Sequence, residues 1–194
     1  TLQILSDTSV IISEGEVLEI SNDKNLEMNE DTYFKIINGK TASLFSAACQ
    51  VGGLIGGAKI NQHQALKSFG TNFGMAFQLI DDAIDYSSNS KLMGKNLGDD
   101  FKEGKITLPI ILAYGRSNNK EKQFWKKVIT KSDKEEENFN KARELLFKYN
   151  CIEDTLVRAN HFADVAIDSL SIFKNNEYKM ALIKLIEESI KRLY

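Results

Sequence analysis

The scarcity of proline constrains the fold of this chain more than any other feature of its sequence. Pro109 is the only proline among 194 residues, whereas average usage of about 5% would give roughly ten in a chain of this length. Proline is excluded from helix interiors and is concentrated in turns and at sheet edges. The sequence therefore predicts an all-α protein that is helical almost from end to end.

Apolar residues at helical spacing place the predicted helices. The segment 87–105 lacks such a stripe, is polar and contains three glycines, so a long loop is predicted there, and loops of that length are usually functional. No repeat, linker or change of composition marks a boundary, so residues 1–194 are assigned to a single domain. The helices are expected over about 1–21, from Asn29 to the glycine pairs at 52–53 and 56–57, from 61 or 62 to 86, and over 107–115, 118–131, 134–149, 152–174 and 177–193.

Charge, apolar runs and cysteines exclude several classes of protein. The 25 basic and 27 acidic residues give a net charge of −2, so no global field favours nucleic acid or an anionic membrane surface. The longest apolar stretch, 44–58, is shorter than the roughly 20 residues that span a bilayer, so no integral membrane protein is expected. Cys49 and Cys151 match no metal spacing and are interpreted as reduced thiols of a cytoplasmic protein.

The first residues are already amphipathic. Ile4, Ile11 and Leu18 recur every seven residues, no methionine begins the chain, and no capping residue announces the helix. We therefore expect residues 1–194 to be the carboxy-terminal part of a longer domain.

Four polar side chains follow one face of the helix predicted to end at 86. Gln78, Asp81, Asp82 and Asp85 are three or four residues apart, and residues at that spacing share a face. The rest of this helix is strongly apolar, where like charges are costly without a counter-ion. A Mg²⁺ ion, which binds through one or two carboxylates together with phosphate oxygens, would remove that cost. An acidic turn on the surface is the alternative.

Two lysines of the predicted loop each follow a glycine directly. Lys95 and Lys105 bracket the pair Asp99-Asp100, and glycine lets the backbone approach a ligand closely. Lysine serves as a point charge for phosphate. Because both lysines follow the carboxylate stripe, a polyphosphate site is predicted, with a flexible loop that binds nothing as the alternative.

Other polar features favour structural interpretations when each is taken alone. Lys40 and Thr41 lie within a predicted helix, where lysine is more often a surface residue. The glycine-rich segment 52–59 is not a phosphate loop, because that loop needs a lysine directly after its glycine and then serine or threonine. His63 and His161 have no partners at metal-ligand spacing, and the interleaved charges of 120–148 are interpreted as a solvated face.

Four segments together resemble one enzyme family. FQLIDDAIDY (77–86) and GKNLGDDFKEGKITLPIILA (94–113) resemble the second aspartate-rich motif and the following loop of the trans-polyprenyl diphosphate synthases, in particular the long-chain octaprenyl and related enzymes. EGEVLEI (14–20) and YFKIINGKTASLF (33–45) extend the likeness at matching spacing. The resemblance covers about residues 1–115 closely and the later helices only by pattern.

The resemblance implies a helical bundle around a central cavity, here without its amino-terminal helices, and a Mg²⁺-dependent prenyltransferase. Such an enzyme condenses isopentenyl diphosphate with an allylic prenyl diphosphate to a longer all-trans polyprenyl diphosphate, a precursor of quinone side chains. The family also implies a homodimer. The implied metal residues are Asp81, Asp82 and Asp85, with Asp81 closest to the metal, and the implied contacts of the diphosphate or the metal ions are Lys40, Thr41, Gln78, Lys95 and Lys105.

Two features depart from the family pattern. The family has a first aspartate-rich motif followed by arginines, upstream of the EGEVLEI segment, and the chain does not contain it. The chain is therefore expected to hold half of the metal site, to lack the isopentenyl diphosphate site and to be inactive by itself. Glutamine is common in the family where Glu19 stands, so Glu19 receives no role.

Two other functions remain as alternatives. A terpene cyclase shares the bundle, but its second metal motif mixes Asn, Ser and Glu, and the Gly-Lys loop argues against it. A non-catalytic partner that stabilises a prenyltransferase dimer is disfavoured by the complete set of Asp81, Asp82 and Asp85 with both loop lysines.

Overall fold

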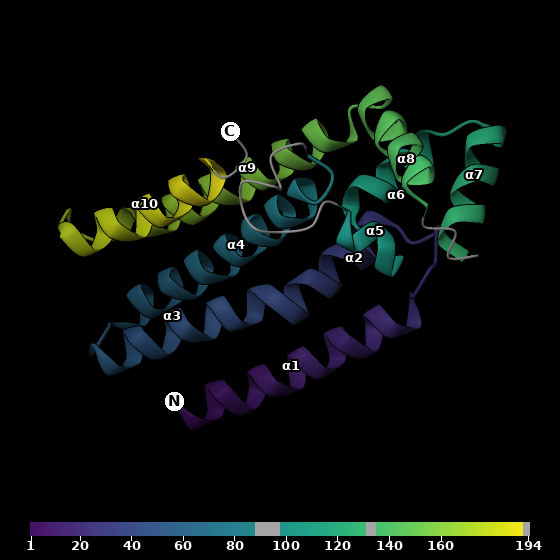
Figure 1. Ribbon diagram of the computed structural model, residues 1–194. Helices are drawn as coiled ribbons and strands as arrows, with labels where there is room; N and C mark the ends of the chain where they lie inside the picture. Colours follow the sequence, from purple (N-terminus) through teal and green to yellow (C-terminus); the bar gives the residue numbers. More distant parts are fainter. Residues whose placement is uncertain (88–97, 131–134, 192–194) are drawn as a thin grey trace.

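The computed structural model describes residues 1–87, 98–130 and 135–191, and every regular element within them is a helix (Figure 1). The all-α class predicted from the scarcity of proline is therefore confirmed. Most helices run close to the predicted ranges. In chain order the elements are α1 (Leu2–Ser21), α2 (Glu30–Ile37), η1 (Asn38–Ala42), α3 (Ser43–Ile55), α4 (Ile60–Ile84), α5 (Asp99–Glu103), α6 (Leu108–Arg116), α7 (Asn119–Thr130), α8 (Glu136–Lys148), α9 (Cys151–Ser169), η3 (Leu170–Ile172) and α10 (Glu177–Lys191).

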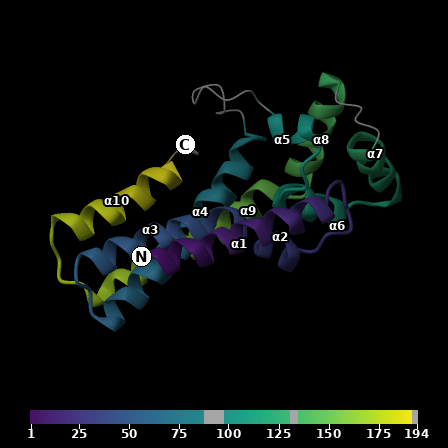
Figure 2. The same ribbon diagram turned by 90° about the horizontal axis from the view of Figure 1, so that it is seen from below.

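The long helices pack side by side with α4 at the centre. α4 contacts α3 on one side and α9 on the other, α1 lies against η1 and α3, and α10 lies against α4 and α9. The short helices α5 to α8 gather at one end of this bundle in both views (Figures 1 and 2). The acidic end of α4 therefore points toward the short helices.

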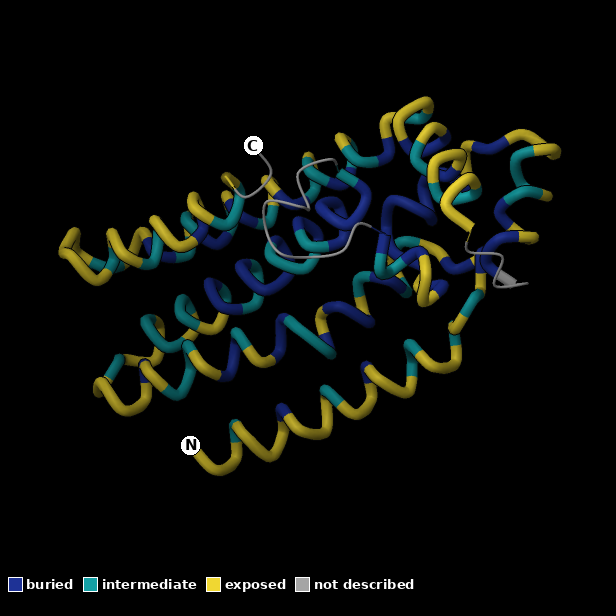
Figure 3. The backbone as a smooth tube through the Cα atoms, in the orientation of Figure 1, coloured by how far each residue is buried: buried dark blue, intermediate teal, exposed yellow. Residues whose placement is uncertain are grey.

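The apolar core follows α4 from Phe69 to the end of the helix. Figure 3 shows this part of the helix mostly buried and α1 mostly exposed. Phe69 and Phe73 belong to a cluster with α9 and α10 residues, while Leu79 and Ile80 belong to a larger cluster that reaches α2 and α6. Phe162 of α9 packs against both clusters. The polar stripe of α4 thus has a fixed apolar backing.

The segment from Asn29 to the glycine pairs forms the predicted helix, but with a π-helical turn in its middle. The Asn29 side chain accepts a hydrogen bond from the backbone N–H of Thr32 at 2.8 Å and so caps α2. The π-helical turn η1 contains Lys40 and Thr41. Such turns add a residue to the helical repeat and are common at functional sites, but nothing in the sequence indicated one.

The predicted loop 87–105 is wrong over 99–103, which form α5. Phe101 of this short helix is fully buried, and Gly98 and Gly104 flank it with φ of 77° and 78°. The helix is stabilised by contacts from elsewhere in the chain, which a search for an apolar stripe does not detect. Lys95 and the rest of 88–97 lie outside the described residues.

Helix α1 presents several large apolar side chains to solvent. Leu2, Val10, Val17 and Ile20 are each more than half exposed. Within the described residues, no helix combines the length and the apolar character needed to cross a membrane.

Candidate functional site

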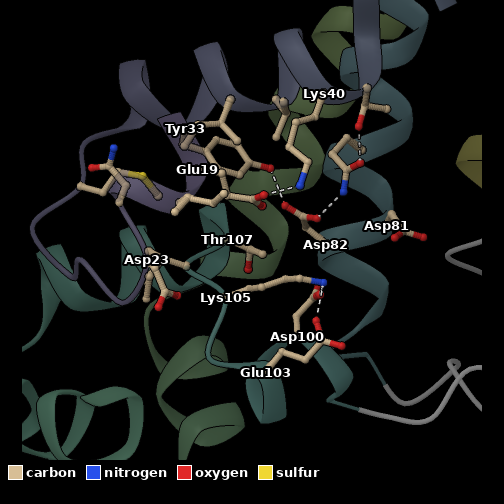
Figure 4. A pocket seen from close by; sticks show the side chains of 18 of the residues that line it. Glu19, Asp23, Tyr33, Lys40, Asp81, Asp82, Asp100, Glu103, Lys105 and Thr107 are labelled. Atoms are coloured by element: carbon tan, nitrogen blue, oxygen red, sulfur yellow. Dashed lines mark hydrogen bonds and ion pairs between the residues drawn. The ribbon is translucent and has the colours of Figure 1, made fainter. Parts of the chain in front are cut away.

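A cavity of about 620 Å³ opens between α1, α2, η1, α4 and the segment that joins α5 to α6 (Figure 4). Isoleucines and a methionine form part of its wall. Among the described residues, six acidic side chains and three lysines also line it, so the charge of the cavity wall favours cations. The charged residues of the wall are Glu19, Asp23, Asp81, Asp82, Asp100, Glu103, Lys24, Lys40 and Lys105.

Hydrogen bonds join four side chains of the cavity into one chain that centres on Asp82. The Tyr33 hydroxyl donates to Asp82 Oδ2 at 2.5 Å, and Gln78 Nε2 donates to Asp82 Oδ1 at 2.8 Å. Thr41 Oγ1 in turn donates to Gln78 Oε1 at 2.9 Å. We call this set the Asp82 network. It connects α2, the π-helical turn and α4.

The carboxyl group of Asp82 is unusual because it is only 2% exposed. Burial, the largest cause, and the nearby charge of Asp100 raise its pKa to about 8, although the hydrogen bonds from Tyr33 and Gln78 act in the opposite direction. A carboxyl group with this pKa gains its negative charge more readily when a cation is close. A cation beside Asp82 would therefore stabilise the charged form of this carboxyl group.

Lys40 reaches the cavity from the π-helical turn and is held by two glutamates of α1. Its Nζ lies 3.0 Å from Glu16 Oε2 and also contacts Glu19. Burial lowers the pKa of Lys40, but the hydrogen bonds with Glu19 and Glu16 outweigh burial, and the net shift is upward. Lys40 is therefore a charged group whose position depends on α1.

Lys105 reaches the same cavity from the segment after α5. Its Nζ lies 3.2 Å from Asp100 Oδ1 and 2.6 Å from Glu103 Oε2, and its side chain is half exposed. Burial lowers the pKa of Lys105, yet the hydrogen bond with Glu103 and the charge of Asp100 raise it overall. A charged lysine thus stands at the cavity mouth.

The three aspartates of α4 have three different environments. Asp81 is partly exposed and projects from α4 away from Asp82 (Figure 4). Asp85 is 6% exposed and is not among the residues that line the cavity. Its Oδ1 and Oδ2 accept hydrogen bonds from the backbone N–H groups of Asp99 at 3.0 Å and Asp100 at 3.1 Å. Asp85 is thus directed at the start of α5.

Most of the predicted site residues meet in this cavity. It is lined by Lys40, Thr41, Gln78, Asp81, Asp82 and Lys105. Within residues 1–87, 98–130 and 135–191, no three acidic, histidine or cysteine side chains are grouped as a metal site, so metal ligation by Asp81, Asp82 and Asp85 stays a prediction. Lys95 lies outside the described residues.

Three residues of the site received no role from the sequence. Tyr33 lies one turn before the π-helical turn, Glu19 lies on α1, and Asp100 lies in a segment predicted to be a loop. Each acquires its role through a partner that is distant in sequence, so spacing alone does not reveal it. For Asp100, its place between the two loop lysines was the only indication.

Known proteins share much of this sequence. A family model described as "Polyprenyl synthetase" matches residues 1–146. The chain is 35% identical over 193 residues to an octaprenyl diphosphate synthase of Haemophilus influenzae and 34% identical over 191 residues to one of Escherichia coli. It is covered almost completely in both alignments but spans only 58% and 59% of these relatives.

Solved structures of other proteins also resemble this chain in fold. A decaprenyl diphosphate synthase from Rhodobacter capsulatus matches with a TM-score of 0.92 and 40% identity, over 100% of this chain and 59% of that one. A polyprenyl synthase from Caulobacter crescentus, complexed with calcium and isoprenyl diphosphate, matches with a TM-score of 0.93, also at 40% identity and with the same coverage. The sequence match and the helical fold agree, and the chain belongs to the polyprenyl synthetase family.

Proposed function

We propose that this chain holds the diphosphate of an allylic prenyl substrate in a polyprenyl diphosphate synthase. The observation that supports this most is that Lys40, Lys105 and the Asp82 network face one cavity. The chain spans about three-fifths of its relatives, so the activity is proposed for what we call the full-length form: this chain joined to the remaining two-fifths of their length. That form would condense isopentenyl diphosphate with the allylic diphosphate.

The donor atoms of the cavity fit Mg²⁺. Magnesium prefers oxygen ligands and is commonly bound through only one or two carboxylates together with substrate phosphates. Burial and the charge of Asp100 raise the pKa of Asp82, and a nearby dication would favour the charged form of its carboxyl group. Asp81 and Asp82 are the residues proposed to hold the ion, which when bound supplies positive charge to the leaving diphosphate.

The remaining groups support the breaking of the allylic carbon–oxygen bond. As that bond breaks, negative charge grows on the departing pyrophosphate, and the ammonium groups of Lys40 and Lys105 stabilise it. The double bond of isopentenyl diphosphate then attacks the allylic carbon and forms the new carbon–carbon bond. A proton lost from the neighbouring carbon passes to a pyrophosphate oxygen. The apolar wall, which includes Ile36, Ile37 and Ile106, would keep water from the allylic carbocation that forms when the carbon–oxygen bond breaks.

Three further parts of the proposal rest on the family resemblance alone. They are a product that serves as a quinone side-chain precursor, a location in the cytoplasm and assembly as a homodimer. The match to the polyprenyl synthetase family favours this function over the terpene cyclase alternative.

The replacement Asp81→Ala in the full-length form tests the proposal. Turnover of isopentenyl and allylic diphosphates is expected to fall by about 100-fold or more, the usual loss when one stabiliser of transition-state charge is removed. The matched control is Asp31→Ala, an exposed aspartate of α2 outside the cavity, which should keep its turnover. Near-normal turnover of the Asp81 variant would refute the metal role, and no prenyl transfer by the unmodified form would refute the function.

A further inference from the structure

We propose that Tyr33 is a positioning residue of this site: its hydroxyl group fixes Asp82, and through Asp82 the side chains of Gln78 and Thr41, in the arrangement that receives the Mg²⁺ ion of a metal-bound diphosphate. The ligand named in this inference rests on the proposed function. The hydrogen bonds themselves belong to the chain without any ligand.

The contact between Tyr33 and Asp82 joins two helices across the wall of the cavity. Tyr33 lies on α2, 49 residues before Asp82, and is only 3% exposed. Its hydroxyl is 2.5 Å from Oδ2, while the amide of Gln78 occupies Oδ1 at 2.8 Å. Figure 4 shows Tyr33 and Asp82 directed toward each other from opposite sides. The two donors together fix the rotation of the carboxylate plane.

The orientation of Gln78 depends on the carboxylate in turn. An amide presents a donor at one end and an acceptor at the other, and its surroundings decide which end points where. Because Gln78 Nε2 donates to Asp82, its Oε1 faces Thr41 and accepts the threonine hydroxyl. Thr41 therefore presents its oxygen lone pairs, rather than its proton, to any other group in the cavity.

Removal of the phenolic oxygen would leave Asp82 Oδ2 buried without this donor. A buried acceptor that loses its partner bears a desolvation cost, so the carboxylate is expected to rotate or to admit water. Rotation withdraws the acceptor of Gln78 and frees its amide to turn. The disturbance then reaches Thr41 and the oxygen atoms that the cavity offers to the cation of a metal-bound diphosphate.

Tyr114 provides a matched comparison. Its hydroxyl donates to Glu27 Oε1 at 2.9 Å, and Tyr114 is buried to a similar degree, at 4% exposure. Tyr114 does not line the cavity. Both Tyr33→Phe and Tyr114→Phe therefore remove one hydroxyl that donates to a carboxylate and keep the aromatic ring, but only the first acts on the Asp82 network.

The test measures the binding of inorganic pyrophosphate with Mg²⁺ to the full-length form by calorimetry. Tyr33→Phe is expected to weaken binding about tenfold, which corresponds to about 1.4 kcal/mol, and Tyr114→Phe less than twofold. In prenyl transfer, Tyr33→Phe should lower kcat about tenfold and leave the KM for isopentenyl diphosphate unchanged. A loss of stability alone would affect both tyrosine variants alike, so equal effects would overturn the inference.

A second variant shows whether Tyr33 acts through Asp82. Asp82→Leu keeps the shape of the side chain but removes both acceptors, so in urea unfolding Tyr33→Phe should destabilise the Asp82→Leu background clearly less than it destabilises the unmodified form. Independent, additive effects of the two replacements on the free energy of unfolding would overturn the inference. Intact pyrophosphate binding without prenyl transfer by the unmodified form would refute the proposed function and leave the role of Tyr33 standing.

Discussion

Two glycines of α4 allow the helix to approach α3 and the π-helical turn η1 closely enough to form the site. A Cβ atom at Gly70 would lie 2.5 Å from the carbonyl oxygen of Phe45, and one at Gly74 would lie 2.6 Å from Cα of Ala42. Both obstructing atoms belong to the backbone, which cannot turn aside as a side chain can. The short distance from Thr41 to Gln78 depends on this approach.

Replacement of Gly70 by alanine is therefore expected to destabilise the protein. Forcing a methyl group into a packed contact usually costs about 1–3 kcal/mol. The matched control is Gly52→Ala in α3, where a Cβ atom meets nothing within 4 Å, and which should stabilise the helix by up to about 1 kcal/mol. Urea unfolding of the full-length form measures both changes, and effects of the same sign would contradict this account of the α3–α4 contact.

Glu121 gives a pH-dependent contribution to stability. Lys148 Nζ at 2.6 Å, the Tyr149 hydroxyl at 2.7 Å and the backbone N–H of Asn118 at 2.8 Å all donate to its carboxylate. The hydrogen bond from Lys148, followed by those from Tyr149 and Asn118, lowers the pKa of Glu121 from 4.5 to about 2. Because the folded-state pKa is the lower one, this stabilisation is complete above pH 4.5 and is lost as the pH falls toward 2.

The variant Glu121→Gln is expected to be less stable than the unmodified protein at pH 7, and the difference should narrow between pH 4.5 and pH 2. Thermal unfolding at a series of pH values measures it. Glu144→Gln, at an exposed position of α8, serves as the control and should show no such narrowing. If the stability difference between Glu121→Gln and the unmodified protein stayed constant down to pH 3, these hydrogen bonds would not favour the charged carboxylate.

At the level of elements, α5 is held in place by the last aspartate of the α4 stripe. The Asp85 carboxylate accepts hydrogen bonds from the first two backbone N–H groups of α5. The backbone carbonyl of Asp85 accepts a further hydrogen bond from the N–H of Gly98 at 3.0 Å. A helix of five residues is too short to be stable by itself. Asp85 therefore sets the position of α5, and with it the positions of Asp100 and Lys105 at the cavity mouth.

Asp85→Ala is expected to expose the amides of Asp99 and Asp100 to hydrogen exchange. Both amides lose their acceptor, so their exchange in metal-free protein should accelerate, as NMR can measure residue by residue. Asn29→Ala is the matched control because it removes the cap of α2 and should expose the amide of Thr32 instead. Unchanged exchange at both α5 amides would show that Asp85 does not hold this element.

The sequence predicted the elements that are stabilised by their own residues and missed those stabilised from outside. The cap at Asn29, the long α4 and the position of Pro109 at the start of α6 follow from local signals. α5 and the π-helical turn were missed because the first depends on Asp85 and the second on packing against α1, where Gly15 meets Gly39. Lys105 was predicted from its place after a glycine and Lys40 from the family resemblance, whereas Lys24 and the glutamates of α1 that hold Lys40 were missed.

At the level of the whole molecule, the described part of the chain supplies carboxylates and lysines to the cavity but no arginine. The arginines of the described residues contact other groups: Arg116 contacts Asp154 and the Tyr149 carbonyl, Arg143 donates to the Tyr86 carbonyl, and Arg158 pairs with Glu30. A second diphosphate would require further positive charge, since acidic groups already outnumber lysines in the cavity wall.

The 194-residue chain alone is therefore expected to bind pyrophosphate with Mg²⁺ but to show no multi-turnover prenyl elongation, whereas the full-length form should show both. The proposed reaction needs two diphosphates side by side, and the cavity offers lysines suited to one. Calorimetry measures the binding, and incorporation of labelled isopentenyl diphosphate measures elongation. Addition of the remaining segment as a separate polypeptide serves as a control and should restore elongation where the two associate. Sustained elongation by the chain alone would show that its own lysines serve both substrates.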